Sequence, residues 1–525
     1  MSSREGQNSR LPILFNRTDK RSAWVSIARL ALILPYAFYS AGGILSRGPQ
    51  IASPASGTPW DDTPVHHSIS GDDDQKWQYF SQPGDTLKAV AARFQVRLQD
   101  IGLNTQVIER QLLDPGTLLI IPRPPLNPYD FPNLIPDHEV VYSPSGRGFD
   151  TLDYVSKAGG YLSTHQEYMR STSLTSAAEI VERVAIENSI HPRLLLALLE
   201  YQCGCVRGPL KDGFQAEYLM GVNEVGRRGL YRQLGWVVNQ LSLGYYGWRR
   251  GLLTDMAFES GDRVHLPPDA NAGTVAVAYL FSRLYDREGW EQAMDSPKGF
   301  AILQDEMFAG SVRSENTDMQ LFPPGLQQPD LSLPFQLDKL WGYTSGPHPA
   351  WETEGALAAL DFAPASEQYG CTRSDAWVVA AADGLIARSE HGAVILDLDQ
   401  DGFEETGWVI LYMHVEDRQR VAEGTFLKRG DKIGHPSCEG GPADGTHVHI
   451  ARKYNGEWIA ADGPLPFMMS GWTAHAGFRP YSGSLTRGTQ RIIANPLSPA
   501  AALISLSDQD LPLDLKISRD LWWEK

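Results

Sequence analysis

The spacing of hydrophobic residues changes several times along the chain, and each change predicts a different kind of structure. Residues 30–45 form one continuous apolar run. Residues 77–122 begin like a strand, continue with apolar positions at helical spacing, and end in a second apolar strand. Residues 150–315 show helical periodicity, whereas residues 331–475 contain repeated strand-like runs. The pattern predicts a multidomain α+β protein with a small βααβ unit, a central all-α region and a C-terminal antiparallel β domain.

A chain of 525 residues is too long for one compact core, so we expect several domains. The expected parts are a basic segment with a signal or anchor over 1–45, a flexible linker over 46–76, the βααβ unit over 77–122, the helical region over 123–330, the β domain over 331–475 and a tail over 476–525. In the helical region we expect helices over 175–187, 192–201, 228–242 and 272–285. In the β domain we expect strands over 377–382, 384–389, 393–397, 408–415 and 446–453.

The N-terminal segment has the charge pattern of an export signal. Arginine and lysine outnumber aspartate and glutamate in residues 1–29, and the apolar run 30–45 follows this basic segment. That run is short for a membrane-spanning helix and suits the apolar core of a signal sequence, although a tilted, uncleaved anchor stays open. In both cases the basic flank predicts that the rest of the chain lies outside the cytoplasm, either secreted or anchored to the membrane at the cell envelope.

Composition limits the classes of binding partner and the cellular compartment that we expect. Hydrophobic residues make up 42% and charged residues 21%, as in ordinary globular proteins, and the net charge of −17 argues against nucleic-acid binding. Four cysteines fit an exported protein. Cys371 and Cys438 lie in one predicted domain and are the expected disulfide. A bridge between Cys203 and Cys205 would be strained, so their pairing stays open.

Histidines and one aspartate in the β domain form a set suited to metal chemistry. The set comprises His348, Asp361, His414, His447 and His449. His447 and His449 are two residues apart in a β-rich run and therefore point from the same face of a strand. A catalytic Zn²⁺ needs three nitrogen or oxygen ligands and an open fourth position. The set therefore predicts a zinc-dependent hydrolase.

Three aspartates suggest a second metal site in the same domain. Asp397, Asp399 and Asp401 have the spacing of a calcium loop. An EF-hand would need Glu at position twelve, where this chain has Trp408, and strands rather than helices flank the run. An acidic β-turn is the favoured interpretation, and Ca²⁺ held by the three carboxylates is the alternative.

The βααβ unit resembles a LysM module. It contains the turn Pro83-Gly84-Asp85-Thr86-Leu87, then Asn104 after the second helix, and a closing Pro-Gly-x-x-Leu-x-Ile-Pro that ends at Pro122. LysM modules bind glycans that contain N-acetylglucosamine, so the resemblance implies an anchor to peptidoglycan or chitin. The glycan contacts that it implies are Gly84, Asp85, Thr86 and Asn104.

The helical region has a weaker resemblance, limited to one helix. The helix after His191 resembles the one that carries the catalytic Glu in lytic transglycosylases and lysozyme-like folds. Gln202 stands at the acidic position before Cys203-Gly204, and a Gln cannot donate a proton as a carboxylic acid does. Glu200 would face another side of the helix. We therefore expect an inactive scaffold or glycan-binding domain.

The β domain resembles the lysostaphin-like zinc endopeptidases, and specifically their β-lytic subgroup. The matching motifs are Gly346-Pro347-His348, Ala359-Leu360-Asp361-Phe362, Leu411-Tyr412-Met413-His414 and His447-Val448-His449. The commoner family spacing would place the first ligand at Leu357, which would mean a broken site, whereas the β-lytic subgroup takes that ligand from Gly-Pro-His. The resemblance implies that His348, Asp361 and His449 hold Zn²⁺ and that His414 and His447 are catalytic.

These features together predict an exported cell-wall zinc metalloendopeptidase. It would cleave peptide bonds in peptidoglycan stems or cross-bridges, while the LysM-like unit holds it on the glycan. The β-lytic resemblance implies cleavage beside small residues such as Gly or Ala. Two other classes stay open, a catalytically silent peptidoglycan-binding protein and a glycosidase that uses the helical region.

Overall fold

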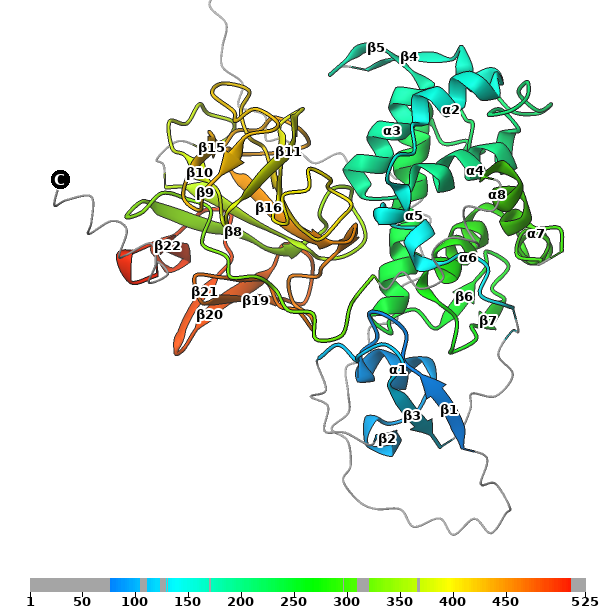
Figure 1. Ribbon diagram of the computed structural model, residues 1–525, viewed down its shortest axis with the longest axis horizontal. Helices are drawn as coiled ribbons and strands as arrows, with labels where there is room; N and C mark the ends of the chain where they lie inside the picture. The colour runs from blue at the N-terminus through cyan, green and yellow to red at the C-terminus, as the bar shows by residue number, and fades with distance from the viewer. Residues whose placement is uncertain are drawn as a thin grey trace, which may run out of the picture. The chain divides into compact units, whose positions relative to one another are not determined.

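The computed structural model (Figure 1) describes residues 76–103, 111–122, 129, 131–169, 171–295, 297–308, 321–365 and 369–510. The expected signal or anchor over 1–45 lies outside these residues, as does the linker over 46–76 except for Lys76. Within the described ranges, no helix is long and apolar enough to cross a membrane.

The N-terminal unit folds around one short helix and a three-stranded sheet. Its elements are β1 (Trp77–Phe80), α1 (Leu87–Arg93), a 3₁₀ turn (Leu98–Asp100), β2 (Gly102–Leu103) and β3 (Leu118–Ile121). The Thr86 side chain begins α1 by accepting the Ala89 N–H, and the helical spacing buries Val90 and Phe94 under the sheet. The strand order is β1-β3-β2, with antiparallel pairing. The second expected helix is therefore only a single turn.

The central region consists mainly of helices. They are α2 (Thr151–Ala158), α3 (Ala177–Asn188), α4 (Pro192–Cys203), α5 (Leu230–Arg249), α6 (Ala272–Leu284), α7 (Arg287–Ala293) and α8 (Phe300–Phe308). Ser176 and Glu179 form a capping box at the start of α3. Gly204 ends α4 in the left-handed conformation, with φ of +61°. Cys203 and Cys205 form a disulfide directly at this end.

Our expectation of an all-α central region is wrong in one respect, because the structure contains two β-hairpins there. They are β4 (Gln166–Met169) with β5 (Ser173–Ser176), and β6 (Asp255–Ala257) with β7 (Arg263–His265). Each strand has only three or four residues, which is too short to produce a clear two-residue period in the sequence.

The C-terminal region is built on antiparallel sheets. Its strands are β8 (Leu340–His348), β9 (Ala359–Pro364), β10 (Val378–Val379), β11 (Gly384–Glu390), β12 (Ala393–Asp397), β13 (Trp408–Met413), β14 (Phe426–Leu427), β15 (Lys432–Gly434), β16 (Val448–Tyr454), β17 (Glu457–Trp458), β18 (Met468–Met469), β19 (Trp472–Ala476), β20 (Gly483–Arg487), β21 (Gln490–Ile493) and β22 (Leu503–Ser505). The largest sheet has the order β14-β11-β12-β13-β16-β9-β8-β22, with β17 beside β16. Cys371 and Cys438 form a disulfide in this region.

Residues 476–510, the described part of the segment that we expected to form a separate tail, supply strands to these sheets. β20 pairs with β19, β21 pairs with β20, and β22 forms an edge of the large sheet by pairing with β8. The β domain therefore extends at least to β22. The boundary was misplaced because β22 pairs with β8, a strand far away in the sequence.

Both faces of the large sheet are buried at its centre. In β12, Val394 and Leu396 belong to the core of the β domain, whereas Ala393 and Ile395 belong to the same buried cluster as the helices. β13 and β16 alternate in the same way, with Leu411 and Ala451 on the helical side. An antiparallel sheet commonly leaves one face in water. Here the helical region covers that face, which explains why all five residues of β12 are buried.

Buried charges are paired where the helical side meets the sheet. The Glu404 carboxylate accepts from Arg388 Nε at 2.7 Å and from Lys453 Nζ at 2.9 Å. Burial opposes ionisation of Glu404, but the positive charges of Arg388 and Lys453 outweigh it and lower the pKa of the carboxyl to about 2. A carboxylate that is removed from water needs such partners, so this network stabilises the fold only while Glu404 is ionised.

Acid is therefore expected to destabilise the protein through Glu404. Its pKa in the folded state lies below the ordinary value of 4.5, so its stabilising effect is present above that pH and is lost as the pH falls toward 2. The full shift corresponds to about 3 kcal/mol. Urea unfolding from about pH 5 to about pH 3 is expected to show about 2 kcal/mol less loss of stability in Glu404→Gln than in the wild type. Equal losses in the two proteins would contradict this assignment.

Candidate metal centre

Three neighbouring strands carry the residues of the predicted zinc site. His348 is the last residue of β8, Asp361 lies in β9 and His449 lies in β16. His449 stands directly opposite Asp361 in the antiparallel register. The two-residue alternation buries Leu360, Phe362, Val448 and Ile450 in the core of the β domain. The same alternation places Asp361 and His449 together on the opposite face of the sheet.

A local irregularity in β8 brings the third ligand to the other two. The register between β8 and β9 shifts between Ser345 and His348. Gly346 is required here, because a Cβ at this position would lie 2.6 Å from the backbone of Ser482 and Gly483. The Gly-Pro-His motif thus allows the chain to pass close to the hairpin between β19 and β20 before it presents His348.

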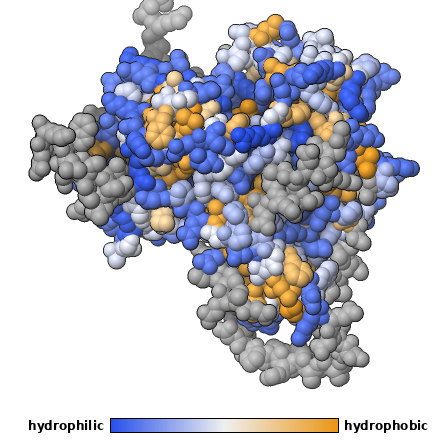
Figure 2. Space-filling view, in the orientation of Figure 1, coloured by the Kyte–Doolittle hydropathy of each residue, from blue (hydrophilic) through white to orange (hydrophobic). Residues whose placement is uncertain are grey.

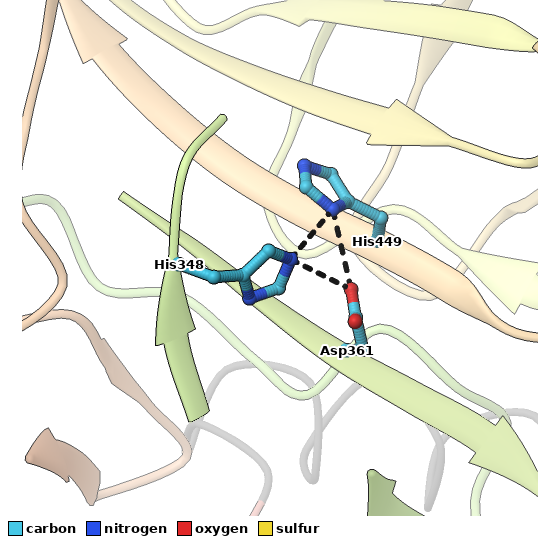
Figure 3. A group of neighbouring side chains, drawn as sticks. All are labelled: His348, Asp361 and His449. Carbon is cyan, nitrogen blue, oxygen red and sulfur yellow. Dashed lines mark hydrogen bonds and ion pairs between the residues drawn. The ribbon is translucent and has the colours of Figure 1, made fainter. Parts of the chain in front are cut away.

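The three side chains converge on one point (Figure 3). His348 Nε2 lies 3.0 Å from His449 Nδ1 and 3.3 Å from Asp361 Oδ1, and His449 Nδ1 lies 3.2 Å from Asp361 Oδ1. Tetrahedral ligands at the usual zinc distances of about 2.0–2.2 Å are separated by about 3.3–3.6 Å. The spacing of the three atoms therefore fits one Zn²⁺ ion.

The outer ring nitrogens of both histidines are held by backbone carbonyls. His348 Nδ1 lies 2.8 Å from the Gly346 carbonyl oxygen, and His449 Nε2 lies 2.9 Å from that of Ala350. A carbonyl oxygen only accepts, so these nitrogens carry the protons. The inner nitrogens are then left with free lone pairs, which is the arrangement that a metal-binding histidine needs.

Asp361 is buried and prepared to hold a cation. Its Oδ1 has no hydrogen-bond donor among the residues that the structure describes. A buried carboxylate oxygen without a donor is costly unless a positive charge meets it. Zinc at this point would remove that cost.

His414 and His447 lie beside the three predicted ligands. Their ring centroids are 4.4 Å apart, and His447 Nε2 lies 3.8 Å from Asp361 Oδ1. His414 Nδ1 donates to the Glu439 carbonyl and His447 Nδ1 to the Gly445 carbonyl, each at 2.7 Å. Burial, together with His447 and His449, lowers the pKa of His414 to about 3. His414 is thus a neutral imidazole at neutral pH.

Tyr481 is a site residue that the sequence did not reveal. Its ring stacks on His348 with centroids 4.5 Å apart, and its backbone bonds on both sides to the Gly-Pro-His motif. Tyr481 has φ of +69°, a conformation unusual for a tyrosine that here holds the ring over His348. It lies in the segment that we expected to be a tail, and its positive φ leaves no trace in the pattern of apolar residues.

Leu357, the position where the commoner family spacing would place a ligand, lies outside the cluster. It occupies the loop between β8 and β9, and its carbonyl accepts from the Ala461 N–H. The arrangement with His348 is therefore the one that the geometry favours.

The predicted calcium residues also come together. Carboxylate oxygens of Asp397, Asp399 and Asp401 lie within 4.8 Å of one another. Asp397 is buried, and its two oxygens accept the backbone N–H groups of Asp399 and Gly402 at 3.1 and 2.8 Å. These bonds are those of an acidic turn, which is the interpretation that we favoured. Calcium binding stays a prediction.

The predicted glycan-contacting residues that the structure describes make contacts within the protein itself. Asp85 is buried, forms an ion pair with Arg93 and accepts from the Tyr79 hydroxyl at 2.6 Å. Thr86 caps α1, and Gly84 is buried with Arg249 beside it. Asn104 lies outside the described residues. Glycan binding by this unit stays a prediction.

Glu200 in the helical region is engaged in a turn. Its carboxylate accepts the backbone N–H groups of Val206 and Arg207 at 2.9 and 3.0 Å and also bonds Arg207 Nε at 3.1 Å. Three donors stabilise the ionised form, which suits a structural carboxylate rather than a proton donor.

Known proteins similar to this chain include proteases. A family model of the N-terminal domain of LasA matches residues 133–317, which is most of the helical region. The chain is 25% identical over 347 residues to Protease LasA of Pseudomonas aeruginosa, an alignment that covers 62% of this chain and 75% of that protein. LasA of a second strain of that species is 25% identical over 315 residues, covering 56% of this chain and 70% of the relative. These relatives support a peptidase.

Two solved structures are similar to part of this chain. The M23 metalloprotease pseudoalterin shares 22% identity, with 32% of this chain and 96% of that chain covered and a TM-score of 0.27. The catalytic domain of lysostaphin from Staphylococcus simulans shares 22% identity, with 23% and 87% covered and a TM-score of 0.17. Similarities at these TM-scores do not establish a shared fold on their own. The LasA relatives and the His-Asp-His group together support a metallopeptidase.

Proposed function

We propose that the protein is a zinc metalloendopeptidase that cleaves peptide bonds in peptidoglycan stems or cross-bridges. The observation that carries this proposal is the group formed by His348, Asp361 and His449, whose ligand atoms are 3.0–3.3 Å apart. When bound, zinc supplies a Lewis acid that activates water and polarises a carbonyl. The three residues leave a fourth tetrahedral position for these groups.

His447 is the residue that we assign to proton transfer. Its Nδ1–H bond to Gly445 leaves Nε2 as a proton acceptor on the side of Asp361. Once protonated, the same nitrogen can deliver the proton to the leaving amine. His414 packs beside it as a neutral ring, and its low pKa of about 3 makes it a poor base at neutral pH. His414 therefore shapes and polarises the site.

Peptidoglycan is the proposed substrate because three sequence features agree on it. They are the export signal over 1–45, the LysM-like unit over 77–122 and the β-lytic motifs around His348. We propose that the LysM-like unit holds the enzyme on glycan at the cell envelope and that the β domain cuts next to small residues.

Digestion of purified peptidoglycan tests this function. We expect new free amines to appear, without new reducing or anhydro ends, and elemental analysis to find about one zinc per chain. New reducing or anhydro ends would support a glycosidase instead. A protein that binds peptidoglycan and releases neither kind of end would be a binding protein, and the proposal would then be wrong.

A further inference from the structure

The loop between the first two predicted ligands is attached to the helical region. This loop, residues 349–358, leaves His348 at the end of β8 and enters β9, where Asp361 lies. Its alanines at 350, 356 and 358 belong to the same buried cluster as the helices. The face of the molecule in Figure 2 is mainly hydrophilic, whereas Asn239 is a polar side chain buried outside the metal centre.

Asn239 lies in α5, is 5% exposed, and uses both ends of its side-chain amide on this loop. Its Oδ1 accepts the Glu354 N–H at 3.0 Å, and the Thr353 hydroxyl lies 3.5 Å away. Its amide nitrogen donates to the Glu352 carboxylate, which only accepts. One side chain therefore fixes three consecutive residues of the loop.

The rest of α5 is shaped to receive the loop. The Glu352 carboxylate lies over Gly235, where a Cβ would come within 3.4 Å of it. Gly355 has φ of +121° and lies against Ser242, where a Cβ would come within 3.0 Å. A side chain at Gly355 would be strained and crowded. The loop therefore has one defined position on α5.

That position determines where a predicted metal ligand points. The Ala350 carbonyl in this loop accepts from His449 Nε2 at 2.9 Å and so directs His449 Nδ1 toward the metal point. His348 and Asp361 flank the same loop. A displaced loop would change the direction of one ligand and the separation of the other two.

We propose that Asn239 is a positioning residue of the metal centre, through which the helical region sets the geometry of the three ligands. The inference rests on the proposed function, because it assumes that His348, Asp361 and His449 bind zinc. It assigns the helical region a direct part in the site, although that region supplies none of the ligands.

The test compares Asn239→Ala with a matched variant, Gln233→Ala, in the full-length protein. Gln233 is also buried in α5 and accepts the Met220 and Val222 N–H groups, but its hydrogen bonds to the described residues stay within the helical region. We expect Asn239→Ala to lower zinc affinity about tenfold in a chelator competition and to change the visible absorption of the cobalt-substituted protein. Gln233→Ala is expected to lower the melting temperature while leaving both metal readouts unchanged.

Exchanging the donor and acceptor roles of Asn239 and Glu352 distinguishes an effect of their hydrogen bond from an effect of lost packing. Asn239→Asp places two carboxylates together and is expected to weaken zinc binding at least as much as Asn239→Ala. In Asn239→Asp with Glu352→Gln, the new carboxylate can accept from both the Gln amide and the Glu354 N–H. This double variant is expected to recover zinc affinity and the cobalt spectrum to within about twofold of the wild type.

The possible outcomes distinguish failure of the proposed function from failure of the positioning role of Asn239. If the wild type binds no zinc, both the proposed function and the role of Asn239 are wrong. If the wild type binds zinc and Asn239→Ala leaves affinity and spectrum unchanged, only the positioning role is wrong. A spectral change that Gln233→Ala reproduces, or that the double variant fails to reverse, also overturns the positioning role.

Discussion

Replacing His348 by Ala is expected to abolish release of free amines from peptidoglycan and to remove zinc from the protein. The change deletes one of three ligands whose atoms are 3.0–3.3 Å apart and leaves Asp361 buried with one imidazole fewer. Loss of an outer-shell partner of a metal ligand typically costs 10–100-fold. Loss of a ligand itself is therefore expected to exceed about 100-fold in affinity and in rate.

His475→Ala is the matched control for this variant. His475 lies in the same β domain, is half-buried and bonds Thr486 at 2.7 Å. We expect this variant to keep its zinc and its activity. If His348→Ala retained normal zinc content and normal amine release, the first ligand would have to be another residue.

Replacing His447 by Ala is expected to lower kcat by about 10²–10⁴-fold while zinc stays bound. His447 lies 3.8 Å from Asp361 and is half-buried, so its removal leaves the three predicted ligands in place. Its proposed part is proton transfer, which affects the chemical step more than substrate binding. Steady-state kinetics on a soluble peptide substrate, with zinc content measured in parallel, would separate these effects.

His414→Ala gives the comparison that assigns the base. His414 is already neutral, with a pKa of about 3, so we expect its loss to slow the reaction less than loss of His447. A larger effect at His414 than at His447 would reverse the assignment of their roles. Loss of zinc from His447→Ala would show that this residue is a ligand.

The sequence predicted that His348, Asp361 and His449 lie together, and the structure brings them together, because the signals for these residues are local. His449 lies in β16 and His447 directly precedes this strand, which buries Val448 and Ile450 with the expected two-residue period. Asp361 likewise lies in a short sequence motif, Ala359-Leu360-Asp361-Phe362. The choice of His348 over Leu357 depended on a motif, and the structure adds the reason, which is the close approach at Gly346.

The missed features around the metal centre depend on contacts between distant segments. Tyr481 reaches His348 only because the segment after residue 475 folds back onto β8 and β19. The loop contact at Asn239 is equally non-local. One clue was available, since the unbroken apolar run in β12 is unusual for an antiparallel strand with one wet face and indicates cover on both sides.

The burial of both faces of the large sheet limits how this enzyme can be shortened. Ile395, Val409, Leu411 and Met413 would meet water if the helices were removed. Exposing each such side chain would remove about 1.5–3 kcal/mol of stabilisation from burial. Together these side chains would form an exposed apolar strip beside the active site. A shortened recombinant protein that begins at the β domain and lacks the helical region would therefore tend to aggregate, unless polar residues replaced apolar ones in that strip.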